Sequence, residues 1–163
     1  MPEMQDGRVH QQLDSSAIEQ VFREQHARLW RSLVLWSGDP DVASDAVAEA
    51  FAQVLARGDE VRDPAAWVWR AAFKIAGGEL ANRRTSRTLA DEPAVAAPDE
   101  LVDVIRALAA LTPKQRASVV LADYAGYPHA EIARLLGSTT SAVGVHVHRG
   151  RRRLRTLLEV SDD

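Results

Sequence analysis

The apolar residues in the first half of the chain recur every three or four positions, which is the spacing of an amphipathic helix. A first stripe of this kind consists of Ile18, Val21, Phe22, Leu29, Leu33 and Val34. Ser16 and Glu19 fit a capping box at its start, and Gly38 follows its end. We therefore expect a helix that begins at Ser16 and ends at Gly38.

Two further helices are expected, each after an Asp-Pro pair. Asp39-Pro40 and Asp63-Pro64 both combine an N-cap side chain with a proline that suits the first helical position. The second helix runs to Gly58, and its stripe consists of Val42, Ala46, Val47, Ala50, Phe51, Val54 and Leu55. The third runs to about Arg84, and its stripe consists of Trp67, Val68, Ala71, Ala72 and Ile75.

Two adjacent glycines, Gly77 and Gly78, interrupt this third pattern. A glycine costs about 1 kcal/mol relative to alanine inside a helix. The last turns of the third helix are therefore expected to kink or fray unless a partner holds them.

Residues 85–99 carry no helical stripe, contain two prolines and are otherwise mostly small or polar. This composition predicts a flexible linker. Beyond it the helical spacing returns with Leu101, Val104, Ile105, Leu108 and Leu111. The sequence thus predicts an all-α protein of two small helical domains, residues 15–84 and 100–160, joined by that linker.

The second block ends in a helix-turn-helix pattern. Thr112, Pro113 and Gln115 fit the cap, first position and capping-box partner of a helix that stops by Gly126. A short helix follows, with an apolar stripe of Ile132, Ala133, Leu135 and Leu136. Gly137 then predicts a turn, and Thr139 the cap of one last helix.

Five of the seven residues from Arg149 to Arg155 are arginines, and none is acidic. The core side of this last helix is expected to be Val143, Val147, Gly150, Leu154 and Leu157. A basic helix face can simply be solvated, but here it follows a capped turn in a helix-turn-helix, which favours contact with DNA phosphates. The predicted DNA contacts are Ser141, Gly144, Val145, His148, Arg149, Arg151, Arg152 and Arg155.

Composition excludes several other classes of protein. The chain has 163 residues and a net charge of −3, and no cysteine that could form a disulfide or a reactive thiolate. No apolar run suits a signal peptide or a membrane span, so we expect a cytoplasmic protein without a membrane partner. We expect no catalytic residues, because no phosphate loop, nucleophile elbow or paired carboxylates appear.

Three histidines, His129, His146 and His148, raise the question of a metal site. His146 and His148 lie two positions apart and therefore point about 200° apart on a helix. No cysteine or carboxylate completes a ligand set near them. We expect neither a metal nor a cofactor.

The chain resembles an extracytoplasmic-function (ECF) sigma factor over nearly its whole length. The resemblance rests on "FREQHARLWRSLVLWSGDPDVASDAVAEAFAQVLA", "DPAAWVWRAAFKIAGGELANRR" and "LTPKQRASVVLADYAGYPHAEIARLLGSTTSAVGVHVHRGRRRLRTLLE". It implies that the first domain is sigma-2-like, binds core RNA polymerase and opens the promoter at the −10 element. The second would be sigma-4-like and read the −35 element through its helix-turn-helix.

The resemblance also implies roles for individual residues of the first domain. Asp45, Ala48 and Glu49 match positions that meet the polymerase, although an ordinary acidic helix face is the alternative for Asp45. The positions that match contacts with the −10 strand are Trp69, Arg70, Phe73, Lys74, Asn82, Arg83 and Arg84. Aromatic rings stack on unpaired bases while basic side chains follow phosphates. Trp67 is expected to lie in the core, and a core position is the open alternative for Trp69.

The implied partners are core RNA polymerase, through its beta and beta-prime subunits, and promoter DNA. Family members are often held by an anti-sigma factor, and the linker would permit that here. Gly144, Val145 and His146 stand where the family commonly has polar or basic residues, so direct base reading is expected to be thin. Two alternatives stay open: a sigma-like interaction module without promoter reading, and a stand-alone helix-turn-helix regulator.

Overall fold

The computed structural model describes residues 6–86 and 98–161, and every regular element in these two ranges is helical. The first block consists of α1 (Asp6–Ser37), α2 (Pro40–Arg57), the 3₁₀ turn η1 (Gly58–Glu60) and α3 (Pro64–Ser86). The second consists of α4 (Asp99–Ala109), α5 (Pro113–Val119), the π-helical turn η2 (Val120–Tyr124), α6 (His129–Leu136) and α7 (Thr140–Ser161). The all-α prediction is confirmed.

The start of the first helix differs from its prediction. α1 begins at Asp6, ten residues before the expected cap, so Ser16 lies inside the helix and is exposed. No proline stands between Asp6 and Ser16 to remove a backbone donor, and glutamine and leucine in this stretch are good helix formers. A capping-box pattern alone therefore did not mark the helix start.

The other predicted starts are confirmed by hydrogen bonds. Oδ1 of Asp39 accepts from the backbone N of Asp41 at 2.9 Å, and Oδ1 of Asp63 accepts from that of Ala66 at 3.1 Å. At α5, Thr112 and Gln115 form the full capping box. These caps satisfy backbone N–H groups that a helix leaves without partners at its first turn.

α3 continues through Gly77 and Gly78 to Ser86, which is the outcome expected if a partner holds the last turns. A Cβ at Gly77 would lie only 3.4 Å from Cη2 of Trp36. The glycine lets the indole of Trp36 approach the helix backbone. Trp36 is thus the partner that the turns around Gly77 and Gly78 were expected to need. Trp36 is itself 8% exposed.

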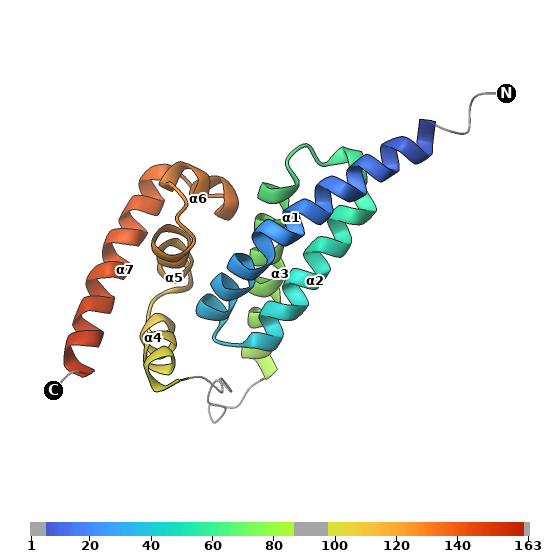
Figure 1. Ribbon diagram of the computed structural model, residues 1–163. Coiled ribbons are helices and arrows are strands. Elements are labelled where there is room, and N and C mark those ends of the chain that lie inside the picture. The colour runs from blue at the N-terminus through green and yellow to red at the C-terminus, as the bar shows by residue number, and fades with distance from the viewer. Residues whose placement is uncertain (1–5, 87–97, 162–163) are drawn as a thin grey trace.

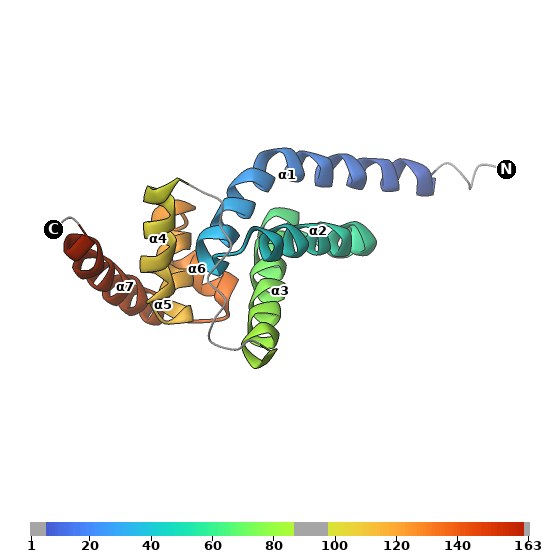
Figure 2. The ribbon, with the colours of Figure 1, turned by 90° about the horizontal axis from the view of Figure 1, so that it is seen from below.

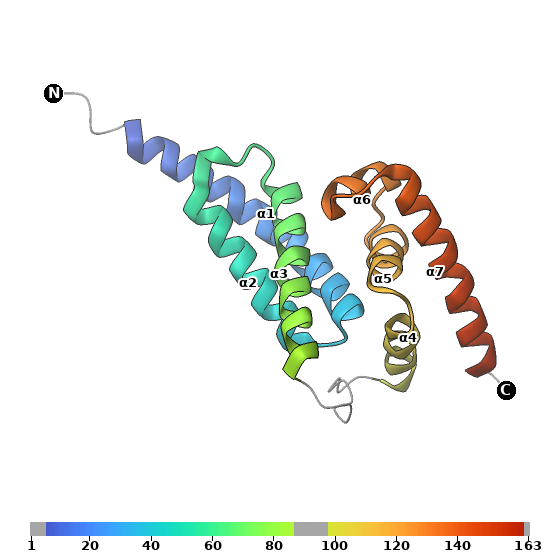
Figure 3. The ribbon, with the colours of Figure 1, turned by 180° about the vertical axis from the view of Figure 1, so that it is seen from behind.

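The two blocks pack against each other around the C-terminal half of α1 (Figures 1 and 2). α1 contacts α4 and η2 of the second block, and α3 contacts α6. Seen from behind, α3 lies between α2 and the second block (Figure 3). The buried apolar side chains form one cluster that includes residues of both blocks.

The proposed linker lies mainly at residues 87–97, outside the described residues. Thr85 and Ser86 belong to α3, and α4 begins at Asp99. The division into two domains and the flexibility of the linker therefore stay predictions.

One buried arginine joins the blocks through backbone carbonyls. Arg116 of α5 is only 7% exposed, and its Nη1 donates to the carbonyl of Trp36 at the end of α1 at 3.0 Å. The same guanidinium donates to the carbonyls of Leu108 at 2.9 Å and Leu111 at 3.2 Å, around the end of α4. Helix C-termini carry unpaired carbonyls and partial negative charge, so a buried cation suits this position.

The crossing of α5 and α7 gives a test of the packing. An added Cβ at Gly150 would lie 2.6 Å from Cγ2 of Val119, so Gly150→Ala should lower the free energy of unfolding by about 1–3 kcal/mol. Gly78 is the control, because a Cβ there meets nothing within 4 Å, and Gly78→Ala should be neutral or stabilise by up to about 1 kcal/mol. Urea unfolding followed by circular dichroism measures both. An unchanged stability of Gly150→Ala would contradict the close crossing.

Candidate nucleic-acid interface

The helix-turn-helix is formed by α6, a glycine turn and α7. Gly137 ends α6 with φ 62° and ψ 41°, the left-handed conformation that glycine adopts without strain. Oγ1 of Thr139 accepts from the backbone N of Ala142 at 3.1 Å and caps α7. Both features confirm the predicted turn and place α7 on the outer side of the second block (Figure 1).

The two faces of α7 are distributed as predicted. Val143, Val147 and Gly150 are buried, and Leu154 and Leu157 are half-buried. On the outer side lie exposed residues of the predicted contact set: Ser141, Val145, His148, Arg149, Arg151, Arg152 and Arg155. Gly144 is half-buried and stands close to His129 of α6, since a Cβ there would lie 3.7 Å from its Nδ1.

Arg151 differs from the other arginines because it is paired with an acid. Its Nε donates to Oδ2 of Asp123 at 2.9 Å and its Nη2 to Oδ1 at 2.5 Å. The hydrogen bond to Asp123 raises the pKa of Arg151 above its ordinary value, with burial acting in the opposite direction. The stretch from Arg149 to Arg155 contains no acid, but Arg151 is paired with a carboxylate that comes from η2 and not from α7.

Three other arginines line an open groove of about 460 Å³ beside α7. They are Arg149, Arg152 and Arg153, and the facing side is formed by Ala110, Thr112 and Gln115. Arg153 was missing from the predicted set. It lies four residues after Arg149 and thus on the same helix side, so helical spacing alone would have found it.

A second basic groove, of about 480 Å³, lies between α2 and α3. Its lining includes Trp67, Arg57, Arg70, Lys74 and Gln53. The Cζ of Arg57 lies 5.6 Å from the centre of a Trp67 ring, within the range of a cation–π contact. This groove combines a half-exposed aromatic ring with three basic side chains.

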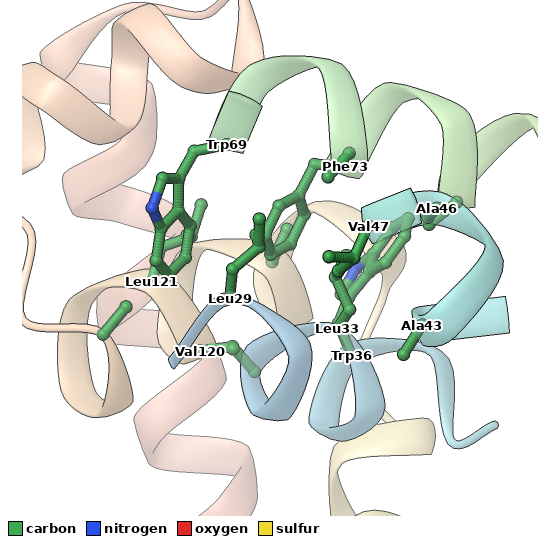
Figure 4. Close-up of a cluster of buried hydrophobic side chains, with 14 of the residues drawn as sticks. Leu29, Leu33, Trp36, Ala43, Ala46, Val47, Trp69, Phe73, Val120 and Leu121 are labelled. Carbon is green, nitrogen blue, oxygen red and sulfur yellow. The ribbon is translucent and has the colours of Figure 1, made fainter. Parts of the chain in front are cut away.

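The two neighbouring tryptophans differ in burial: Trp69 lies in the core, which was its open alternative, and Trp67 is less buried than expected. Trp69 is fully buried and Phe73 is 5% exposed, whereas Trp67, expected in the core, is half-buried at the groove. Nε1 of Trp69 donates to Oε1 of Gln25 at 3.0 Å, and its ring meets that of Tyr127 edge to face at 5.0 Å. Figure 4 shows the Trp69 indole pointing toward Leu121 of η2.

The helix geometry explains why the two rings differ in burial. Trp67 and Trp69 lie about 200° apart around α3, so only one can face α2. The other faces α1 and the second block, which covers it. Helical spacing predicts the angle between the two rings. It does not indicate that the second block covers the side on which Trp69 lies.

The remaining residues expected at the −10 strand differ in exposure. Arg70, Lys74 and Asn82 are exposed, and the side chain of Arg84 lies outside the described residues. Arg83 is half-buried in ion pairs with Asp39 and, at 2.9 Å, with Glu79. Burial lowers the pKa of Arg83, but the two carboxylates outweigh it and raise the pKa. Arg83 thus ties α3 to the N-cap of α2.

The residues expected to meet polymerase are all exposed on the outer face of α2. They are Asp45, Ala48 and Glu49. Two large apolar side chains are also exposed on this block, Leu55 at 53% and Phe22 at 44%. The ring of Phe22 lies edge to face with that of Phe51 at 5.0 Å, which places it against α2.

The described residues contain no group of three histidine, cysteine or acidic side chains placed to hold a metal ion. Within the same residues, no helix has the length and apolar character needed to cross a bilayer. His129 contacts α7, as described above, and His148 is exposed on the outer face.

Comparison with known proteins identifies the class of protein that this fold defines. Residues 101–154 match the family described as "Sigma-70, region 4". The chain is 31% identical over 154 residues to the ECF RNA polymerase sigma factor SigM of Mycobacterium tuberculosis, covering 89% of this chain and 79% of SigM. It is 26% identical over 161 residues to SigL of the same organism, covering 90% of this chain and 91% of SigL.

Solved structures give the same fold. The sigma factor RpoE of Bartonella quintana, in complex with the anti-sigma factor NepR, superposes with a TM-score of 0.74 at 22% identity, covering 87% of this chain and 96% of RpoE. CnrH, in complex with the cytosolic domain of CnrY, also gives 0.74 at 22% identity, covering 94% of each chain. The chain belongs to the ECF family of RNA polymerase sigma factors, and it is an alternative sigma factor.

The pairing of Arg151 gives a test of the α7 face. Arg152→Gln should reduce the slope of log affinity against log salt concentration by about 1, because a phosphate contact is lost. Arg151→Gln should change this slope much less, since Asp123 already neutralises Arg151. Fluorescence anisotropy with labelled duplex DNA at several salt concentrations measures both variants. A larger effect of Arg151→Gln than of Arg152→Gln would show that the ion pair does not hold in solution.

Proposed function

We propose that the chain directs core RNA polymerase to promoters by contacting DNA at two surfaces. The α2–α3 groove would take the unpaired −10 strand, and the outer face of α7 would lie against the −35 element. The observation that carries this proposal is the pair of basic surfaces, one with an aromatic ring and one on a recognition helix, in a member of the ECF family.

The groove has the chemistry of a single-strand binding site. Unpaired bases stack on aromatic rings, at about 1–3 kcal/mol per base, while lysine and arginine hold the phosphates. Trp67 offers such a ring, and Arg57, Arg70 and Lys74 surround it. Trp67 therefore takes the stacking role that the family resemblance implied for Trp69, whose ring is buried.

The α7 face is suited to phosphate contact more than to base reading. Arg149, Arg152 and Arg153 are exposed cations in one groove. Gly144 offers no side chain, while Val145, 47% exposed, could touch a thymine methyl group in the major groove. Phosphate contacts of this kind position the protein on DNA. The sequence preference of the protein would then come from few base contacts.

The polymerase would bind the outer face of α2. Asp45 and Glu49 suit a basic partner surface, and electrostatic complementarity sets register and association rate more than raw affinity. The exposed Leu55 beside them adds apolar area of the kind found at interface centres. The beta and beta-prime subunits of core polymerase are the proposed partners.

A regulatory partner is proposed on the basis of the solved relatives. Both RpoE and CnrH were captured with a second protein, the anti-sigma factor NepR and the cytosolic domain of CnrY respectively. We propose that this chain also binds an anti-sigma factor. The chain would act in the cytoplasm without an active site of its own, and polymerase would supply the chemistry.

Run-off transcription tests the function directly. Core polymerase of the same bacterium should start transcription at new sites on a genomic fragment library when this protein is added. Those sites should share a −10 and a −35 sequence. Polymerase binding without any new start site would instead support an interaction module that no longer reads promoters.

The groove is tested by Trp67→Ala, with Trp67→Phe as the matched control. Loss of the ring should reduce run-off product about tenfold or more, since one stacking contact is lost. Phenylalanine keeps a ring and should retain most of the activity. Circular dichroism confirms that both variants are folded. Equal loss in the two variants would argue against stacking.

A further inference from the structure

The outer face of α7 has a centre and two flanks. Each residue of a helix advances about 100° around the axis, so the exposed residues of the centre share an arc of about 80°. They are Ser141, Val145, His148, Arg152 and Arg155. Arg149 and Arg153 lie on one flank of this arc, and Arg151 lies on the other. If α7 lies in the major groove, each flank faces one of the two phosphate strands.

The flank of Arg149 and Arg153 is open and cationic. Both arginines line the groove of about 460 Å³ beside α7, and the residues on its facing side, Ala110, Thr112 and Gln115, carry no charge. Among the described residues, neither arginine is paired with an acid. This flank therefore offers two positive charges to a phosphate strand.

The opposite flank is neutralised by Asp123. Nε and Nη2 of Arg151 donate to the two carboxylate oxygens of Asp123 at 2.9 and 2.5 Å, and this two-pronged geometry fixes the orientation of the guanidinium. The side chains of Arg151 and Asp123 are 50% and 41% exposed, so the pair lies at the surface where DNA would approach. A phosphate strand that approaches this flank meets the carboxylate as well as the guanidinium.

The backbone of η2 fixes the position of this carboxylate. The backbone N of Ala125 donates to the carbonyl of Val120 at 3.0 Å, five residues back, which is the wide turn of a π-helix. Such turns frequently occur at functional sites. Leu121 is completely buried, and Val120 and Ala125 are almost so. Asp123 therefore stands on a segment that is anchored in the core beside α7.

We propose that Asp123 masks Arg151 and thereby lowers the affinity of the chain for DNA of any sequence. The proposal rests on the proposed function, because it assumes that α7 faces DNA. Phosphate contacts strengthen binding to every DNA sequence alike. A masked Arg151 contributes no such contact, while the centre of the outer face stays available for the −35 element. Asp123 is thus a specificity-determining residue that acts by exclusion.

The mask matters because DNA outside promoters is in large excess. A genome offers about 10⁶–10⁹ competing sites, and binding to them depends almost entirely on phosphate contacts. One more free arginine on α7 would strengthen binding at each of these sites. The other proposed contacts, at the α2–α3 groove and with polymerase, do not involve Arg151. Asp123 therefore lowers the competition from bulk DNA without weakening those contacts.

The mask is tested with the full chain and a labelled duplex of random sequence. Asp123→Asn keeps the size of the side chain and removes its charge. It should raise the affinity about tenfold at about 0.1 M salt and steepen the slope of log affinity against log salt concentration by about 1, because Arg151 gains a phosphate contact. Fluorescence anisotropy over a series of salt concentrations measures both quantities.

Asp103→Asn is the matched control. Asp103 is exposed on α4, and among the described residues it is not paired with an arginine. The variant changes the net charge of the chain by the same amount as Asp123→Asn. It should leave the slope unchanged, because it releases no arginine.

A double variant identifies the arginine that gains the contact. In the Asp123→Asn background, Arg151→Gln should return the affinity and the slope to the wild-type values. A gain that persists without Arg151 would overturn the mask, and so would the absence of any gain in Asp123→Asn. Circular dichroism checks that the variants are folded. Asp123→Ser is the second variant, and it should give the same gain.

Arg152→Gln distinguishes a failure of the mask from a failure of the proposed function. If Arg152→Gln weakens binding but Asp123→Asn does not strengthen it, the mask is wrong and the DNA-facing role of α7 stands. If neither variant changes binding, α7 does not face DNA, and the proposed −35 contact is wrong together with the mask.

Discussion

The structure depends on how helix ends are satisfied where the two blocks meet. α1 and α4 end around Arg116, and η2 ends against Arg28 of α1, where their last carbonyls accept hydrogen bonds from these arginines. An unpaired buried carbonyl costs about 1–3 kcal/mol, and Arg116 and Arg28 donate to carbonyls at these ends. Both guanidiniums also lie where helix dipoles concentrate negative charge. Two arginines therefore make the contact between the blocks possible.

The same contact determines which surfaces are open. Packing of η2 and α6 against α1 and α3 buries Trp69 and leaves Trp67 at the edge of the α2–α3 groove. α7 meanwhile keeps its basic face outside. The closed arrangement thus stabilises the fold and displays both of the proposed DNA-binding surfaces. The contact between the blocks stabilises the free chain, whereas the proposed activity requires the blocks to separate.

The features predicted correctly from sequence are local ones. The caps at Asp39, Asp63, Thr112 and Thr139, and the apolar side of α7, follow from side chains a few residues apart. Apart from Arg153 and the start of α1, the features that were missed depend on contacts between distant segments. Asp123 reaches Arg151 from another element, Asp39 reaches Arg83 from the start of α2, and the second block covers Trp69. Periodicity fixes the angle of a side chain on its helix, but it does not tell which side another element will cover.

The account is tested most directly by measuring the distance between the two blocks in the promoter-bound polymerase. Fluorescent labels at Asp59→Cys and Glu159→Cys would be compared in the free protein and in a transcribing complex. The account predicts that energy transfer is strong in the free protein and falls sharply in the complex, as the blocks separate by tens of ångströms to contact both elements. Strong transfer in a complex that still produces run-off RNA would contradict it.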